Sequence, residues 1–580
     1  WVMQKAQAKC PVKRLWISSL TEEAIRQGFA NLKDQSEYQP LYLAGLSRAI
    51  GDWILGMNAT RLYTLKYGQN RQVLSIGRVQ TPTLALIVNR QKEIDNFKPE
   101  AYWVLSTIYR DTLFTATKGK FTDKEEGERA FATIANKDFE ITGVVKKKGT
   151  EAPPHLFDLT SLQVECNRKF SYSAETTLNL IQSLYEKKLT TYPRVDTQFL
   201  SDDIYPKCPL ILKGVCGYET FTQPLLGKAL NKSKKVFDSS KVTDHHAIIP
   251  TGETPSGLSA DERTIYQMVV NRFIEAFSPD SEEERMQVRF THGTNIFTWK
   301  ACRQISLGWK AVQKGKEVEA EMKEDGDEQI LSSLPSLTEE EVLPLVSAEI
   351  TAHKTKPKPL YTEATLLSAM ENAGKEVEDA ESKKAMAECG IGTPATRANI
   401  IETLILRDYI RRDKKVIIPT EKGLAVYEIV KDKKIANAEM TGSWELALAA
   451  IEAGKMPSDK FSQGINSYVS TICEELLSLT PEQKSYPVYR CPKCGQQSVG
   501  IYAKVAKCRH ETCGFHVFRE VCGILLSEDN IRDLISSGRT PILKGLTSKA
   551  GKKFNAQLVL GEDYATSFEF ENKKGKQKGR

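Results

Sequence analysis

Long apolar runs are missing from this sequence. The longest candidates, such as residues 83–88, are far shorter than the roughly 18 residues that cross a bilayer. A G-x4-G-K-S/T phosphate-binding loop is also absent, so ATP-driven work is not indicated. No repeat recurs at the periods of solenoid proteins. These absences argue against a membrane span, a nucleotide-driven motor and a repeat array.

Regular cysteine pairing is missing as well. Of the 12 cysteines, five fall between residues 491 and 522 and the others are scattered singly. This spacing is not that of a disulfide framework and indicates a reducing compartment. The late group contains Cys-x2-Cys, a gap of 13 residues and Cys-x4-Cys, which predicts a structural zinc site. A redox pair or unliganded cysteines remain alternatives for the same four residues, Cys491, Cys494, Cys508 and Cys513.

A strong excess of one charge is lacking too. The formal net charge is only +7, but residues 1–100 hold 14 Lys and Arg against 8 Asp and Glu, whereas 317–341 is rich in acids. A partner with a phosphate backbone would be attracted to the first region and repelled by the second. Ordinary solvated faces explain the same charges equally well.

The length of 580 residues predicts several domains, because a usual domain has about 100 to 200 residues. Hydrophobic residues are 40% and charged residues 27% of the chain, as in folded globular proteins. The sequence starts at Trp1 without an initiator methionine, and we expect a truncated start.

Periodicity predicts alternating helical and strand-rich stretches. Residues 15–17 predict a strand, followed by a helix capped by Ser19 or Thr21, as at the end of an α/β domain. A hairpin wing after a helix is predicted at 407–423, and a flexible basic tail at 573–580. Further helices are expected in 41–95 (with a break between 68 and 75), 160–190 and 363–478, and strands in 102–109 and 285–360.

The segment TTYPRVDT (190–197) contains a candidate nucleophile. Pro193 holds Tyr192 extended, and in an extended chain residues 192, 194 and 196 point the same way. A phenol ionises only near pH 10, so a nucleophilic tyrosine needs a nearby cation, and Arg194 is placed to supply one or to hold the attacked phosphate. A structural tyrosine beside a surface pair of Arg194 and Asp196 is the alternative.

The segment TDHHAIIPT (243–251) places two of only 7 histidines side by side. Adjacent residues of an extended chain face opposite ways, so at most one of His245 and His246 should point at a given site. A histidine beside a phosphodiester can donate a hydrogen bond or a proton. A buried histidine bonded to backbone explains the pattern as well.

Two predicted helix starts favour anion binding. In 73–94, a glycine-containing turn with Arg78 precedes a helix that has Pro82 in its first turn. The stretch 390–404 repeats this arrangement with Thr393 as the expected N-cap. Each signal is weak alone, because many helices begin in this way.

Taken together and in this order, four segments resemble the signature set of the type IA DNA topoisomerases, closer to the topoisomerase III branch. The resemblance spans about residues 13 to 480. The four segments are SIGRVQTPTLALIV, TTYPRVDT, TDHHAIIPT and GIGTPATRANII.

The resemblance implies a multidomain α+β toroid with a strand-rich arch, two helical winged-helix-like domains, a remnant of a Toprim α/β domain and a zinc-ribbon-like C-terminal region. The implied boundaries are 1–31 for the end of the Toprim domain, 32–96 with 363–482 for a helical DNA-binding domain, 97–152 with 279–362 for the arch, 153–278 for the helical domain with the tyrosine, and 483–580 for the C-terminal DNA-binding region.

The resemblance also implies roles for residues. Tyr192 is the expected nucleophile, which forms a 5′-phosphotyrosyl link, and Arg194 is expected to stabilise the phosphate or the phenolate. Asp196 and His245 match motif positions around that site. The positions that match the expected DNA contacts are Ser75, Arg78, Gln80, Arg48, Thr396 and Arg397.

Magnesium and zinc are the expected ions. The family's Asp-x-Asp-x-Glu magnesium motif belongs to the Toprim domain and does not occur in 1–31, so we expect the magnesium ligands upstream of residue 1. The chain alone should then relax DNA poorly. Single-stranded and negatively supercoiled DNA are the expected substrates of ATP-independent relaxation or decatenation by a monomer in the bacterial cytoplasm, at the nucleoid. A helicase partner is left open, and no membrane partner is expected.

Two rival functions remain for comparison. A tyrosine relaxase of the histidine-metal type uses His-x-His, whereas His245 and His246 are adjacent, and a recombinase needs a late tyrosine with an Arg/His set that does not occur. A nonenzymatic, zinc-containing single-stranded DNA-binding protein stays open.

Overall fold

The computed structural model describes residues 2–17, 22–68, 73–109, 112–135, 137–242, 244–292, 295–314, 328–331, 333–376, 390–478, 489–502, 504–548 and 552–570. The chain forms two compact units: unit 1 is Trp1–Ile50 with Gly77–Ser462, and unit 2 is Gly51–Ile76 with Gln463–Arg580. The helix caps expected at Ser19 and Thr21, most of the acidic run and the basic tail lie outside the described residues. None of the described helices is both long and apolar enough to cross a membrane.

Unit 1 begins with a small hairpin-like pairing. Strand β1 pairs antiparallel with β2, on either side of helix α2. The prediction of a strand at residues 15–17 is wrong, because the pairing of β1 with β2 involves only Lys13 and Arg14, the two residues before it. Leu15 and Ile17 instead lie against Gly28 of α2, where an added Cβ would meet their side chains at 2.8 and 2.5 Å. The elements are α1 (Val2–Lys5), β1 (Lys13–Arg14), α2 (Glu22–Ala30), β2 (Lys33–Asp34) and η1 (Gln35–Tyr38).

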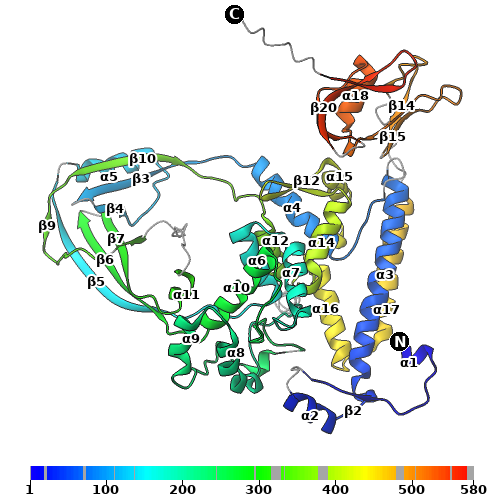
Figure 1. The fold of residues 1–580 in the computed structure, drawn as a ribbon. Helices are drawn as coiled ribbons and strands as arrows, with labels where there is room; N and C mark the ends of the chain where they lie inside the picture. The colour runs from blue at the N-terminus through cyan, green and yellow to red at the C-terminus, as the bar shows by residue number, and fades with distance from the viewer. Residues whose placement is uncertain are drawn as a thin grey trace, which may run out of the picture. The chain divides into compact units, whose positions relative to one another are not determined.

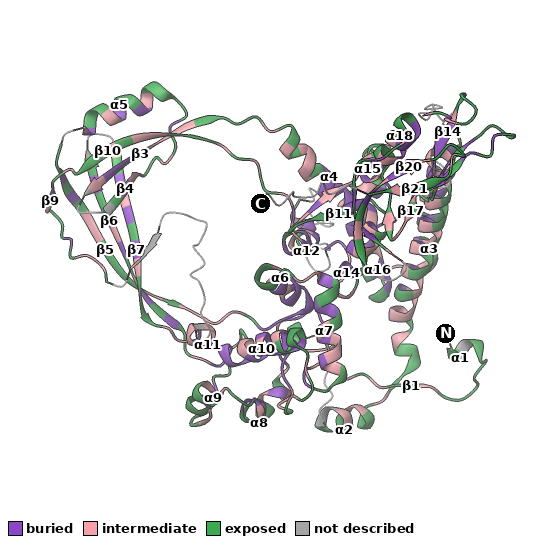
Figure 2. Ribbon diagram, turned by 45° about the horizontal axis from the view of Figure 1, so that its top comes forward, coloured by how far each residue is buried: buried purple, intermediate pink, exposed green. Residues whose placement is uncertain are grey.

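An eight-stranded sheet unites two parts of the chain that a helical insertion separates. Its order is β10-β3-β4-β7-β6-β5-β9, and β8 pairs in parallel with β7. Phe114, Phe290 and Phe297 fill its core, packed against Ile134 of α5, and Figure 2 shows buried residues on β4 and β7. The elements are β3 (Ala101–Tyr109), β4 (Thr112–Ala116), α5 (Lys124–Ile134), β5 (Phe139–Glu151), β6 (Ser281–His292), β7 (Asn295–Ser306), α11 (Lys310–Lys314), β8 (Glu328–Ile330), β9 (Val342–Leu343) and β10 (Ser347–Lys354).

The insertion is helical, as the sequence predicts. Asp158 caps α6 through the backbone N–H of Ser161 at 2.7 Å, and Ser173 caps α7 after a left-handed Ser171. The apolar stripe of α7 faces the core, so this helix is fixed where it leads into the tyrosine segment. The elements are α6 (Leu159–Phe170), α7 (Ala174–Glu186), η2 (Asp202–Lys207), α8 (Cys208–Gly214), α9 (Glu219–Leu226), η3 (Ser239–Lys241) and α10 (Ala260–Glu275).

A second helical group of unit 1 carries the predicted hairpin wing. Strands β11 and β12 pair antiparallel directly after α14, which confirms the hairpin. Thr393 caps α14 and Pro394 is its first residue, also as predicted. Figure 1 shows these elements near α4. They are α4 (Gln80–Asp95), α12 (Glu363–Glu371), η4 (Ala373–Glu376), α14 (Pro394–Leu406), β11 (Ile410–Asp413), β12 (Val416–Pro419), α15 (Glu421–Val430), η5 (Lys434–Ala436) and α16 (Ala438–Glu452).

Unit 2 contains the later parts of α3 (Gln39–Tyr67) and α17 (Ser458–Ser478), which lie side by side (Figure 1). Lys66 Nζ donates to the Leu477 carbonyl at 3.4 Å. The C-terminal part of the unit has its own core of strand residues and of α18 residues such as Leu534. Its elements are β13 (Tyr489–Arg490), β14 (Gln497–Ile501), β15 (Val505–Cys508), β16 (His516–Phe518), β17 (Glu520–Val521), β18 (Ile524–Leu525), α18 (Glu528–Ser537), β19 (Leu543–Thr547), β20 (Lys553–Leu560) and β21 (Thr566–Glu569).

Candidate functional site

The tyrosine segment runs extended between two other segments of unit 1. The Thr191 N–H donates to the Ile249 carbonyl at 3.0 Å, and the Leu159 N–H donates to the Val195 carbonyl at 3.2 Å. Pro193 and Val195 are buried, whereas Arg194 and Asp196 are exposed. This alternation follows from the two-residue period of an extended chain, and it places both charged side chains on the solvent side.

The ring of Tyr192 contacts two other aromatic rings. The His245 ring centroid is 4.5 Å away with an interplanar angle of 41°, and the Tyr185 centroid is 5.4 Å away, nearly perpendicular. Tyr185 belongs to the last turn of α7. The structure thus brings together Tyr192 and His245 from segments that lie more than 50 residues apart.

The second histidine has a different environment. His246 Nδ1 lies 2.8 Å from the carbonyl oxygen of Ala247. A carbonyl can only accept, so Nδ1 carries the proton. Burial lowers the pKa of His246. His246 is therefore a neutral, backbone-bound side chain, and His245 is the histidine that contacts the tyrosine.

The start of α6 connects the tyrosine segment to α14. Gln198 donates from Nε2 to the Asp158 carboxylate at 2.9 Å. Two residues further on, the Thr160 hydroxyl accepts from Arg397 Nη1 at 2.9 Å. Arg397 is 2% exposed and also contacts the Glu371 carboxylate at 3.4 Å, where burial raises the pKa of Glu371. Arg397 thus holds the start of α14 against α6.

Thr396 lies at the surface one residue earlier. It closes a capping box with Thr393, whose N–H donates to the Thr396 hydroxyl at 3.0 Å. The side chain of Thr396 is exposed. Of the two residues predicted here, the structure therefore places Thr396 at the surface and Arg397 inside the protein.

Arg48 and Arg78 converge on one acid that sequence reasoning missed. Arg78 Nη1 lies 2.9 Å from Glu445 Oε1, and Arg48 pairs with the other oxygen of the same carboxylate. The Arg78 guanidinium also stacks 5.0 Å from the ring centroid of Trp444. The sequence signal was a lone Glu445 inside the otherwise apolar stretch of α16. Gln80 begins α4 close by in the chain.

The structure places Ser75 in unit 2, half-buried ahead of α4. Nearby in that unit, the Thr60 hydroxyl accepts from the Ile76 N–H at 3.1 Å, and the Thr64 hydroxyl accepts from the Leu74 N–H at 2.9 Å. The stretch around Ser75 is thereby fastened to α3.

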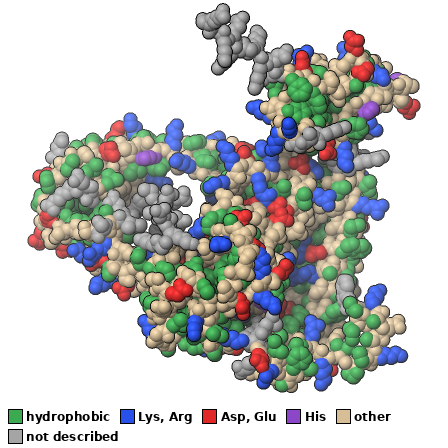
Figure 3. All heavy atoms as spheres, viewed as in Figure 1, with side chains coloured by type: hydrophobic (Ala, Val, Ile, Leu, Met, Phe, Trp, Pro, Cys, Tyr) green, Lys and Arg blue, Asp and Glu red, His purple; other side chains and the backbone are tan. Residues whose placement is uncertain are grey.

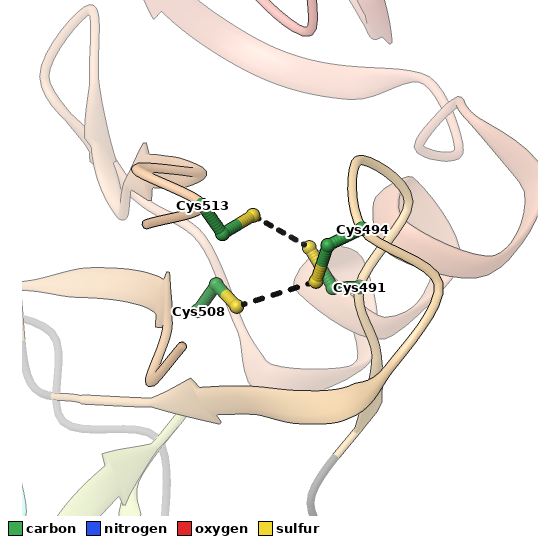
Figure 4. A group of neighbouring side chains, drawn as sticks. All are labelled: Cys491, Cys494, Cys508 and Cys513. Atoms are coloured by element: carbon green, nitrogen blue, oxygen red, sulfur yellow. Dashed lines mark hydrogen bonds between the residues drawn. The ribbon is translucent and has the colours of Figure 1, made fainter. Parts of the chain in front are cut away.

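The four predicted metal-ligating cysteines come together (Figure 4). Their Sγ atoms all lie within 4.8 Å of one another, with Cys491 and Cys513 3.6 Å apart and Cys494 and Cys508 3.7 Å apart. Four sulfurs in a tetrahedron around zinc, each about 2.3 Å from the ion, would be about 3.8 Å apart. The donor set therefore fits zinc, which would cross-link two strand ends.

The thiols of the cluster differ in acidity. A backbone N–H at Gln496 lowers the pKa of Cys494 to about 6, whereas burial raises the pKa of Cys491 to about 12. Among the described residues, this cluster is also the one group of three or more His, Cys, Asp or Glu side chains suited to a metal.

The chain is similar to known DNA topoisomerases over most of its length. The sequence profile described as DNA topoisomerase matches residues 36–463, and one described as C-terminal repeat of topoisomerase matches 512–571. DNA topoisomerase 3 of Bacillus cereus is 35% identical over 532 residues, which is 89% of this chain and 72% of the relative. DNA topoisomerase 3 of Bacillus subtilis is 36% identical over 532 residues, with the same coverage.

The full-length topoisomerase I of Thermotoga maritima has a similar fold. The TM-score is 0.62 at 21% identity, over 99% of this chain and 82% of that one. This likeness confirms the multidomain α+β topoisomerase fold that the sequence predicts. Together with the profile match over most of the chain and the two Bacillus relatives, it shows that the chain belongs to the type IA DNA topoisomerases of the topoisomerase III kind, enzymes that cleave and rejoin DNA.

Proposed function

We propose that this chain cleaves and rejoins one strand of DNA through Tyr192. The phenol releases its proton as its oxygen attacks a backbone phosphorus. The bond from phosphorus to the 3′ oxygen breaks, and that oxygen takes up one proton to leave as a 3′-hydroxyl. The 5′-phosphate stays on Tyr192 until the 3′-hydroxyl attacks in reverse. One phosphodiester replaces another, so ATP is not required, and the free energy of negative supercoiling or of linked circles gives the direction.

One observation carries this proposal. Tyr192 is fixed against His245, with their ring centroids 4.5 Å apart, on an extended segment that exposes Arg194. Arg194 would bind the attacked phosphate through charge-assisted hydrogen bonds. His245 is placed to donate a hydrogen bond or a proton to the reacting oxygens. Asp196, two residues beyond Arg194, would orient that guanidinium.

A single DNA strand would lie along the helix starts of unit 1. Thr396 is exposed at the start of α14, where the positive end of the helix dipole favours a phosphate. We assign Arg48, Arg78 and Gln80 of unit 1 to the same strand, and we assign a DNA contact to Ser75 of unit 2 as well. Arg48 and Arg78 are paired with Glu445 in the free protein, so DNA phosphates would compete with that carboxylate. Arg397 supports Thr396 from inside.

Figure 3 shows Lys and Arg side chains mixed with Asp and Glu over this part of unit 1, so local geometry rather than net charge would select the strand.

The cysteine cluster would hold zinc in a ribbon that binds single-stranded DNA. On the ribbon face opposite its core, the Arg509 guanidinium contacts Tyr502 Oη at 3.2 Å and Lys507 lies 5.5 Å from the same ring. His516 and Phe518 lie on the neighbouring strand, and Phe518 is 63% exposed. Aromatic rings interleaved with cations are suited to stacking bases and neutralising phosphates.

We propose that the domain limits given above correspond to these roles. We also propose that the protein is a monomer and acts on nucleoid DNA, with or without a helicase. The family's Asp-x-Asp-x-Glu magnesium motif does not occur in residues 1–31, so we expect the 1–580 chain alone to have weak activity. Turnover by purified 1–580 at the rate of the complete gene product would contradict this expectation.

The test is covalent trapping. The complete gene product is incubated with end-labelled single-stranded DNA and magnesium and quenched in detergent. A protein–DNA adduct is expected with the wild type and none with Tyr192→Phe, which keeps the ring and lacks the nucleophilic oxygen. Tyr185→Phe is the matched control, because it removes the neighbouring phenol and should still form the adduct.

The alternative is a nonenzymatic zinc protein that binds single-stranded DNA. A wild type that binds the labelled strand without any adduct would favour it and would overturn the catalytic proposal.

A further inference from the structure

We infer that Thr191 is a positioning residue, whose hydroxyl fixes Tyr192 against His245. This inference rests on the proposed role of Tyr192 as the nucleophile. Thr191 itself touches neither the tyrosine ring nor a reacting atom, since adjacent side chains of an extended chain point to opposite sides.

The hydroxyl of Thr191 makes two hydrogen bonds to the segment that carries His245. It donates to the Ala247 carbonyl at 3.2 Å and accepts from the Ile249 N–H at 3.0 Å. The Thr191 backbone N–H adds a third bond, to the Ile249 carbonyl at 3.0 Å. One residue is thus bonded at three points to a single stretch of chain, which fixes the register between the two segments.

The stretch that receives these bonds is itself rigid. Its other side is bonded to two more segments, because the Ile248 N–H donates to Phe157 at 2.8 Å and the Ala247 N–H donates to Phe199 at 2.9 Å. Ala247 and Ile249 are 0% and 1% exposed, so water cannot replace a lost partner. His245 lies only two residues before Ala247. A shift of Tyr192 relative to this stretch therefore changes its contact with His245 directly.

The chain offers two matched controls for the same substitution. Thr190 is the preceding residue, and its buried hydroxyl lacks a hydrogen-bond partner in the described structure. Thr251 joins the same two segments farther from the tyrosine, where its hydroxyl donates to the Lys188 carbonyl at 2.7 Å. Thr190→Val controls for the added methyl, and Thr251→Val controls for a lost hydrogen bond between these segments.

The experiment measures single-turnover formation of the covalent adduct by the complete gene product, at saturating single-stranded DNA. Thr191→Val should lower the rate roughly 10- to 100-fold, as expected when a reacting atom is displaced by a fraction of an ångström to about 1 Å. Thr191→Ser should restore most of the rate, because it keeps the hydroxyl. The Kd for the same DNA, measured in a Tyr192→Phe background, should not change. Thr190→Val and Thr251→Val should cleave like the wild type.

Each other outcome has a distinct meaning. Thr191→Val cleaving at the wild-type rate overturns the positioning role alone. An equal loss of cleavage rate in Thr191→Val and Thr251→Val also overturns it. The loss would then follow from any weakening of the pairing between the two segments and not from Thr191 in particular. A wild type without a Tyr192-dependent adduct overturns the nucleophile and the positioning role together. Thermal melting is used to check that each variant is folded to the same extent as the wild type, so that the rates compare native proteins.

Discussion

The tyrosine segment and the cysteine ribbon assemble their key side chains in different ways. In unit 1, Tyr192 meets His245 because backbone and threonine hydrogen bonds pair two segments, and neighbouring segments pack against both. In unit 2, Cys491 directly follows strand β13 and meets Cys513 in the turn between β15 and β16, with a small core around them. The first arrangement is maintained by hydrogen bonds and packing, whereas the second brings together four thiols in a geometry that fits a zinc ion.

This difference predicts which perturbations each region tolerates. Removing a metal should affect the ribbon and leave the tyrosine segment intact. Removing a buried charge or a hydrogen bond should affect unit 1 and leave the ribbon intact. Large cross-effects would break the comparison.

The largest expected effect is loss of the folded ribbon on zinc removal. Structural zinc contributes on the order of 10 kcal/mol of apparent binding free energy in small zinc domains, so Cys494→Ala or a strong chelator should leave 489–570 open to proteolysis. Zinc content and limited trypsin digestion measure this. Cys522→Ala, which changes a cysteine outside the cluster, should keep both the zinc and the protection. A chelated protein with an unchanged digestion pattern would contradict the ion-dependent side of the comparison.

An intermediate effect is expected at Glu445. Glu445→Gln leaves Arg78, whose side chain is 5% exposed, without its carboxylate, and should lower the free energy of unfolding by roughly 3 kcal/mol. Urea unfolding, followed by the fluorescence of Trp444 and its neighbours, measures the change. Glu452→Gln, at an exposed site of the same helix, is the control and should change little. If DNA phosphates compete for these arginines, Glu445→Gln should also bind single-stranded DNA more tightly.

The smallest expected effect is a pH dependence at Glu262. Hydrogen bonds from Lys187 and Ser183 and from the Ser259 N–H lower the pKa of Glu262 from 4.5 to about 2. A lowered pKa in the folded state means that the stabilisation is complete above about pH 5 and is lost as the pH falls from 4.5 towards 2.

Urea unfolding between pH 7 and 2.5 measures this loss. Glu262→Gln should be less stable at pH 7 and should lose less on acidification. Glu253→Gln, in the exposed loop before α10, should keep the wild-type slope. If the free energy of unfolding changes with pH equally in the wild type and in Glu262→Gln, Glu262 does not contribute to the interactions that hold α7 and α10 together.

Local patterns allowed much of the fold to be predicted. The strand β3, the cap and proline at the start of α14 and the hairpin of β11 and β12 could all be predicted from short stretches of sequence, because their signals depend on neighbours in the chain. The strand expected at residues 15–17 failed for the opposite reason. The side chains of Leu15 and Ile17 pack against Gly28 of helix α2, a contact that the strand-like pattern of three residues does not reveal.

Site residues divide in a similar way. Spacing indicated the four cysteines, since short sequence intervals set which ligands can reach one ion. The partners of Arg48 and Arg78 could not be predicted, because Glu445 lies more than 350 residues away along the chain. The burial of Arg397 was equally hidden, since the same helix start could expose it or turn it inward.

By itself, the sequence determined the family, the helical and strand-rich stretches and the candidate tyrosine with its flanking charges, because these are properties of residue order. Only the tertiary structure decided that Thr191 joins the segments of Tyr192 and His245, and that Glu445 holds two arginines. Such choices depend on which distant segments pack together, and that depends on the burial of the whole core rather than on any local preference.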